Sequence, residues 1–201
     1  ETIEKFHDTE NRLANFEKAL AADKLGRAKD CAPEIAFVKA HAADCSVALE
    51  ALRAGRLPLR VTHNDTGEGI CVIDLDTVMP GLSINDFGDS IRFGANHSAE
   101  DERDLSKVNF DLPLFDIYTK GFLEGAAGTL TDAEKEYLPW GAKLMTLECG
   151  IRFLTDYLQG DTYFKVSRAR QNLERCRTQF KLVADMENVW DEMASIVKKY
   201  S

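Results

Sequence analysis

The sequence lacks any hydrophobic run of the roughly 20 residues that a membrane-spanning helix requires, and no signal-peptide pattern opens it. It also lacks a basic excess, because its formal net charge is −9, whereas a general nucleic-acid binder presents a basic face. There is no internal repeat and no low-complexity linker. These absences predict a cytoplasmic protein with neither a membrane nor a nucleic acid as its partner.

No C-x-x-C pair occurs, and the cysteines are odd in number and widely spaced, which argues against a disulfide framework or a zinc site. We therefore expect reduced thiols that act as small core residues: Cys31, Cys45, Cys71, Cys149 and Cys176.

Apolar residues make up 44% of the chain and recur mostly at helical spacing. This periodicity predicts helices within residues 3–28, 33–55, 84–96, 115–126 and 132–159, and a last amphipathic helix over 182–197. Thr131 and Glu134 stand in capping-box relation at the start of the fifth segment. Two short β-branched runs bounded by turn residues, 57–63 and 69–76, predict strands. The fold class predicted is one mainly α domain with a small central β element.

The β element carries the residues that suggest chemistry. His63 and Asp65 follow the first predicted strand, and Asp74 stands near the end of the second. Phosphoryl transfer needs one carboxylate that accepts a proton from the attacking hydroxyl and another that holds Mg²⁺. An H-x-D triplet alone is a weak signal, but between two such strands it becomes moderately specific. The alternative is a strand-terminal Asp that caps a loop, and His63 is expected to be structural in either case.

A second kinase-like triplet, Asp86-Phe87-Gly88, does not fit the metal role. It opens a predicted helix after Pro80-Gly81 rather than closing a strand. Asp86 is therefore expected to cap that helix or to support the catalytic loop by hydrogen bonds.

The strings LRVTHNDT, IDLDTVMPG and DFGDSIRFGA resemble the aminoglycoside-phosphotransferase-like small-molecule kinases. Within that superfamily they are most similar to the N-acetylhexosamine 1-kinases, and the likeness continues through FHDT, KALAADKLGRA, ECGIRFLTDYLQGDTYF and RTQFKLV. The resemblance implies the C-terminal lobe of a protein-kinase-like fold, ATP and Mg²⁺ as cosubstrates, and an amino sugar as acceptor.

The resemblance also implies roles for individual residues. Asp65 would be the catalytic base toward the sugar C1 hydroxyl, and Asp74 the Mg²⁺ ligand. Asp76, Arg152 and Tyr163 would contact the sugar. Without the resemblance, Arg152 and Tyr163 would read as ordinary surface or helix residues.

Two departures from the family qualify these expectations. No Gly-rich phosphate loop and no strand Lys with a helical Glu partner occur, so the nucleotide-binding residues are expected in an N-terminal lobe outside residues 1–201. The catalytic loop is also short by roughly a dozen residues against the kinase-type loop. We expect additional residues between Thr66 and Gly67 in the molecule, hence a mass above 22.5 kDa; a real deletion is the alternative.

Two other functions remain open at this level. One is a related kinase of another alcohol, such as an aminoglycoside, choline or homoserine. The other is a non-catalytic pseudokinase that binds sugar or nucleotide. A cationic acceptor would call for an acidic or aromatic cage, so Arg152 beside the catalytic carboxylates favours a neutral hydroxylated one.

Overall fold

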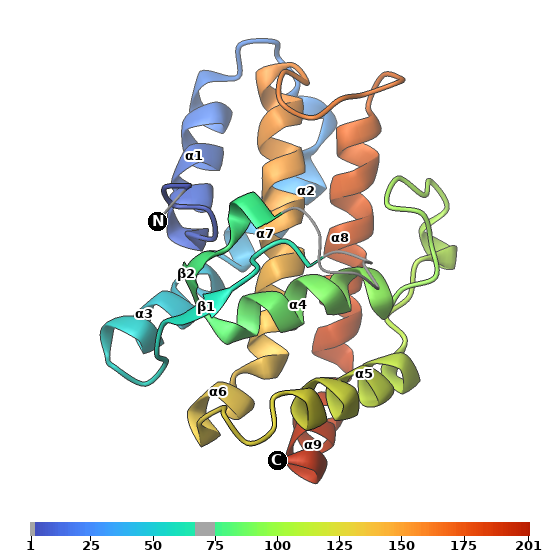
Figure 1. The fold of residues 1–201 in the computed structure, drawn as a ribbon. Helices are drawn as coiled ribbons and strands as arrows, with labels where there is room; N and C mark the ends of the chain where they lie inside the picture. The colour runs from blue at the N-terminus through green and yellow to red at the C-terminus, as the bar shows by residue number, and fades with distance from the viewer. Residues whose placement is uncertain (1–2, 67–74) are drawn as a thin grey trace.

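The computed structural model describes residues 3–66 and 75–201. Within these residues the protein is mostly helical, with one small two-stranded antiparallel sheet (Figure 1). The expected mainly α fold with a small β element is therefore confirmed at that level of detail.

Helix α7 (Leu138–Gln159) is the centre of the molecule and is buried along nearly its whole length. Its sequence is apolar on several faces, which is typical of a helix enclosed by others. Three helices pack on it: α1 (Thr9–Ala22), α4 (Ser83–Gly94) and α8 (Gln171–Asn188). Figure 1 shows α7 running between α1 and α8, with α4 crossing it.

The remaining helices complete two hydrophobic clusters that share α7. The first half of α7 contributes to a cluster with α4, α5 (Leu112–Gly125) and α9 (Trp190–Tyr200). The second half contributes to a cluster with α1, α2 (Ala32–Ala40) and α8. The shorter helices are α3 (Val47–Arg53), α6 (Asp132–Glu136) and the single turns Ala28–Asp30, Asp44–Ser46, Leu75–Thr77 and Leu105–Lys107.

The sheet consists of β1 (Arg60–Thr62) and β2 (Met79–Gly81), with Arg60 opposite Gly81 and Thr62 opposite Met79. The first predicted strand is thus confirmed, although shorter. The second falls mostly on residues 67–74, outside the described part, and its end is wrong, because Leu75 and Asp76 lie in a 3₁₀ turn. Strand β2 was not predicted because Pro80-Gly81 reads as a turn, yet an edge strand tolerates a residue that donates no ladder hydrogen bond.

Three predicted helices are each split in two. The segment 33–55 breaks at His41, whose ring bonds the Phe37 carbonyl at the end of α2 (2.8 Å). The segment 132–159 breaks at Tyr137, because Pro139 suits the first turn of a new helix. The last helix breaks at Val189, which lets α9 turn onto α5 and sets Trp190 against Trp140.

Cys31, Cys45, Cys149 and Cys176 are free and buried, as expected of core thiols, and Cys71 lies outside the described residues. Among the helices of the described part, none combines the length and apolar character needed to cross a membrane.

Candidate functional site

Strand β1, which leads into loop 63–66, is held in place by an ion pair between Arg60 and Glu134. The guanidinium of Arg60 donates to both carboxylate oxygens of Glu134 (2.9 and 2.6 Å), and the Ser83 hydroxyl and the Thr131 amide donate to the same carboxylate (2.8 Å each). The predicted capping box is confirmed. Burial works to raise the pKa of Glu134, but these donors outweigh it and lower the pKa to about 2.

Asp86 holds the backbone of the loop. The amides of His63 and Asn64 donate to its two carboxylate oxygens at 3.0 and 2.7 Å. Burial raises the pKa of Asp86 against the opposing effect of these donors. Of the two structural roles expected for Asp86, this geometry corresponds to loop support.

Asn64 adopts a left-handed backbone conformation (φ 65°), which asparagine tolerates better than most residues. Its buried side chain accepts from the Thr62 hydroxyl (2.9 Å) and donates to the carbonyl of Thr77 (3.1 Å). A β-carbon at Gly81 would overlap both the Thr62 hydroxyl and the Asn64 side-chain oxygen, so β2 needs glycine here. The loop conformation is therefore fixed by side chain as well as by backbone.

Thr66 closes the loop on the other side of Asp65. Its hydroxyl donates to the Asp86 carbonyl (3.0 Å) and accepts from the Ser90 hydroxyl (2.8 Å). The loop is thus held through the backbone of Asn64 and the side chain of Thr66, while the side chain of Asp65 between them is exposed. An exposed carboxylate on a fixed backbone is preorganised to meet a ligand.

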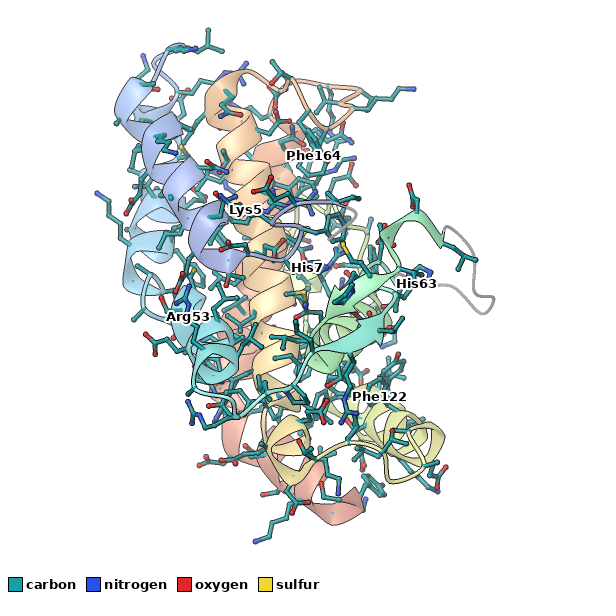
Figure 2. The ribbon with its side chains drawn as sticks, turned by 60° about the vertical axis from the view of Figure 1, so that its left-hand side comes forward. Lys5, His7, Arg53, His63, Phe122 and Phe164 are labelled. Atoms are coloured by element: carbon teal, nitrogen blue, oxygen red, sulfur yellow. The ribbon has the colours of Figure 1, made fainter. Side chains whose placement is uncertain are left out.

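A buried ionic group connects this loop to α7. His7 Nε2 lies 2.7 Å from the Asn64 carbonyl oxygen, and Nδ1 lies 3.3 Å from Glu148 Oε2. Arg12 Nε is 3.5 Å from Glu148 Oε1. Figure 2 shows His7 between the α7 ribbon and the loop that carries His63. His7 therefore links the backbone of the loop to the buried Glu148 carboxylate of α7.

One helical turn after Glu148, α7 contributes Arg152 to a cavity of about 200 Å³. The Arg152 guanidinium carbon lies 5.9 Å from the ring centre of Tyr163 and 5.3 Å from that of Phe164. The charge of Arg152 helps to lower the pKa of Glu148, but its guanidinium forms no hydrogen bond within the described residues, so its donors are available to a ligand. The cavity is lined by Arg12, Asn15, Arg152, Thr155, Asp156, Gln159, Tyr163 and Phe164.

Asp156 shapes the wall of this cavity. One carboxylate oxygen accepts from the amides of Thr162 (2.9 Å) and Tyr163 (2.8 Å), and the other accepts from the Phe164 amide (3.0 Å) and the Asn172 side chain (2.9 Å). These four donors occupy a carboxylate that is only 2% exposed. Asp156 thereby fixes the turn that presents Tyr163, whose side chain is exposed.

The structure brings together only some of the residues expected in the site. Arg152 and Tyr163 share the cavity, and Asp65 lies on the fixed loop joined to α7 through His7. Asp76 is exposed in the turn before β2 and is not among the residues that line the cavity. Asp74 lies outside the described residues.

A group with metal-ligand chemistry occurs elsewhere: His41, Asp44 and Glu187. The ammonium of Lys143 lies 2.8 Å from Asp44 and 2.7 Å from Glu187, so this group already surrounds a cation. Burial lowers the pKa of Lys143, but these two carboxylates outweigh it and raise the pKa above its ordinary value. We interpret the group as a structural ion network.

The sequence reading missed His7, Arg12, Glu148 and Asp156. His7 and Glu148 are 141 positions apart, and only the packing of α1 against α7 joins them. The strings FHDT, ECGIRF and TDY, which contain three of them, contribute to the family resemblance but assign no role to these residues. Glu148 and Asp156 share one signal, charge inside an otherwise apolar helical segment; His7, which lies before α1, and Arg12 do not carry it.

No protein-family model matches the chain. Its function therefore has to be inferred from the motifs and from the geometry of loop 63–66 and the cavity beside Arg152.

Proposed function

We propose that this chain is the acceptor-binding, catalytic lobe of a cytoplasmic ATP-dependent small-molecule phosphotransferase, with an N-acetylhexosamine as acceptor and its C1 hydroxyl as nucleophile. The observation that carries the proposal is the exposed Asp65 carboxylate on a loop that is held through the backbone of Asn64 and the side chain of Thr66. Phosphotransfer depends mainly on such positioning, because the protein makes few covalent steps itself.

In this proposal Asp65 accepts the proton of the acceptor hydroxyl as its oxygen forms a bond to the transferred phosphorus. The bond from that phosphorus to the nucleotide breaks, and the proton stays on Asp65 until it passes to solvent. Asp86 does not touch the substrate, because its carboxylate is occupied by the amides of His63 and Asn64. It keeps Asp65 directed at the acceptor.

ATP supplies the phosphoryl group and Mg²⁺ neutralises its charge in this class of reaction. Asp74 is the residue proposed to hold the ion, with Asp76 nearby on the same segment. Nucleotide contacts are proposed to come mostly from a lobe outside residues 1–201.

The cavity favours a neutral hydroxylated acceptor over a cation. Two guanidinium groups, those of Arg12 and Arg152, line it. Its one carboxylate, Asp156, is occupied by backbone amides and by Asn172. A quaternary or polyamine cation would be repelled by the Arg152 guanidinium and would meet no free carboxylate on the wall. Sugar hydroxyls and an N-acetyl oxygen can instead accept hydrogen bonds from a guanidinium, and a sugar ring can stack on Tyr163.

The test is an ADP-release assay on the full-length protein with GlcNAc, GalNAc, an aminoglycoside, choline and homoserine as acceptors. We expect turnover with one or both amino sugars and formation of the 1-phosphate. Turnover with choline alone would refute the acceptor assignment. Sugar binding without turnover on any acceptor would instead identify a pseudokinase.

A further inference from the structure

We propose that His7 is a positioning residue that acts as an imidazolium and clamps the catalytic loop by donating to the Asn64 carbonyl. This inference rests on the proposed function, because it concerns how Asp65 is aimed. His7 lies in the segment before α1 and does not line the cavity beside Arg152. It is linked to that cavity through Glu148, which also contacts the wall residue Arg12.

The first argument is the chemistry of the two ring nitrogens. Nε2 faces the Asn64 carbonyl oxygen at 2.7 Å, and Nδ1 faces the two Glu148 oxygens at 3.3 and 3.4 Å. A carbonyl and a carboxylate only accept hydrogen bonds, and a neutral imidazole carries a single N–H. Both contacts are made together only when both nitrogens are protonated.

The second argument is the charge that surrounds the ring. Glu148 of α7 contacts it directly, and Asp86 and Asp89 of α4 face it from the other side. The opposing charges are Arg12 of α1 and Arg152 of α7, both of which act on Glu148. Burial lowers the pKa of His7, but the carboxylates outweigh it and raise the pKa above 6.5.

The third argument is the place of the clamped carbonyl. It belongs to the peptide that joins Asn64 to Asp65, so its orientation sets the direction in which Asp65 leaves the loop. Asp86 binds the preceding amides, and His7 binds this carbonyl. Loss of the His7 donor would free the peptide to rotate even with Asp86 in place.

The first test is independent of turnover and uses NMR titration of the full-length protein over roughly pH 5 to 9. We expect both His7 nitrogens to be protonated near neutral pH and to titrate above 6.5. The amide signals of Asp65 and Thr66 should shift with the same midpoint, and Glu148→Gln should lower that midpoint. A neutral His7 ring at neutral pH, or loop amides that ignore its titration, would overturn the inference.

The second test is kinetic and compares three variants in the ADP-release assay. His7→Ala should lower kcat by about 10- to 100-fold, with a smaller change in KM, because misaiming affects the chemical step. His7→Gln keeps one amide donor that does not titrate, so it should retain more activity than His7→Ala. It should also lack the alkaline decline in kcat that the inference predicts for wild type.

His41→Gln is the matched control. His41 also bonds a backbone carbonyl through one nitrogen (Phe37, 2.8 Å) and a carboxylate through the other (Glu187, 3.0 Å), but it supports α2 rather than the loop. Its pH profile should follow wild type. If His41→Gln and His7→Gln change the profile alike, His7 is merely structural and the inference fails.

The two proposals fail in different ways. If no acceptor is phosphorylated although His7 and the loop amides titrate together, the proposed function falls and the clamp stands. If turnover is present and His7→Ala keeps a wild-type kcat, the clamp falls and the proposed function stands.

Discussion

Gly88 of α4 lies directly against Gly141 of α7, so that neither position has room for a β-carbon. At Gly88 the added atom would overlap the Gly141 carbonyl oxygen, and at Gly141 it would overlap the Ile84 carbonyl oxygen. The two backbones approach each other through this pair of glycines. The contact matters for the site because α4 carries Asp86 two residues before Gly88.

Gly88→Ala is expected to destabilise the protein by about 1–3 kcal/mol, the usual cost of forcing extra atoms into a packed core. Chemical denaturation measures it. The control is Gly121→Ala in α5, where no atom lies within contact distance of an added β-carbon. That change should be neutral or stabilising by up to about 1 kcal/mol, because alanine favours a helix. Equal effects at the two positions would contradict the close approach.

Glu134→Gln is expected to destabilise the protein and to alter its pH dependence. The folded-state pKa of about 2 lies below the ordinary 4.5, so the carboxylate contributes stability above pH 4.5 that is lost as the pH falls toward 2. At neutral pH the cost should be about 1–3 kcal/mol, because an amide group then replaces one oxygen of the buried carboxylate and faces hydrogen-bond donors. Glu136→Gln, at an exposed position of the same helix, should change little. If the stability of Glu134→Gln fell as steeply as that of wild type between pH 4.5 and 2, the stabilising role of the Glu134 carboxylate would be contradicted.

Asp65→Asn is expected to lower kcat in the ADP-release assay by about 10²- to 10⁴-fold, the usual contribution of a positioned general base. Sugar binding, measured by calorimetry, should stay near wild type, because the amide keeps the shape of the carboxylate. The unfolding midpoint should also stay unchanged, since the side chain is exposed. A variant with near-normal kcat would refute the base assignment.

Asp156→Asn should weaken acceptor binding by roughly 10-fold with a smaller effect on kcat, because it loosens the turn that presents Tyr163. The substitution replaces one carboxylate oxygen, which accepts hydrogen bonds, with an amide nitrogen that faces backbone N–H groups. The free energy of unfolding should therefore also fall by about 1–3 kcal/mol. Asp191→Asn, on the exposed face of α9, is the control for loss of one charge. A KM equal to that of wild type would show that Asp156 does not influence acceptor binding.

Local patterns predicted the features that depend on neighbouring residues. The helical period located α4 and α5, and the Thr131–Glu134 spacing located a capping box that the structure contains. Pro139 is a local signal of the same kind, because proline suits the first turn of the helix that begins at Leu138. Strand β2 was hidden because a Pro-Gly pair usually indicates a turn, and its pairing with β1 depends on a partner in space.

The candidate site was predictable only in part for the same reason. Asp65 and Asp86 belong to short motifs, so they could be selected from the sequence. Glu148 could not, because a glutamate inside an apolar helix has no meaning until His7 is placed against it. Contacts between segments far apart in the chain are decided by helix packing, which a single sequence does not display.

The sharing of α7 by both hydrophobic clusters has a consequence for how the protein melts. Neither half can lose its structure alone, because each half would strip one end of α7 of its packing and expose it to water. Both clusters are therefore expected to unfold in one cooperative transition, with calorimetric and van't Hoff enthalpies that agree. Glu148 lies where the two clusters join on α7, and its contact with His7 links loop 63–66 to them. The loop is therefore expected to lose its structure in the same transition as the two clusters.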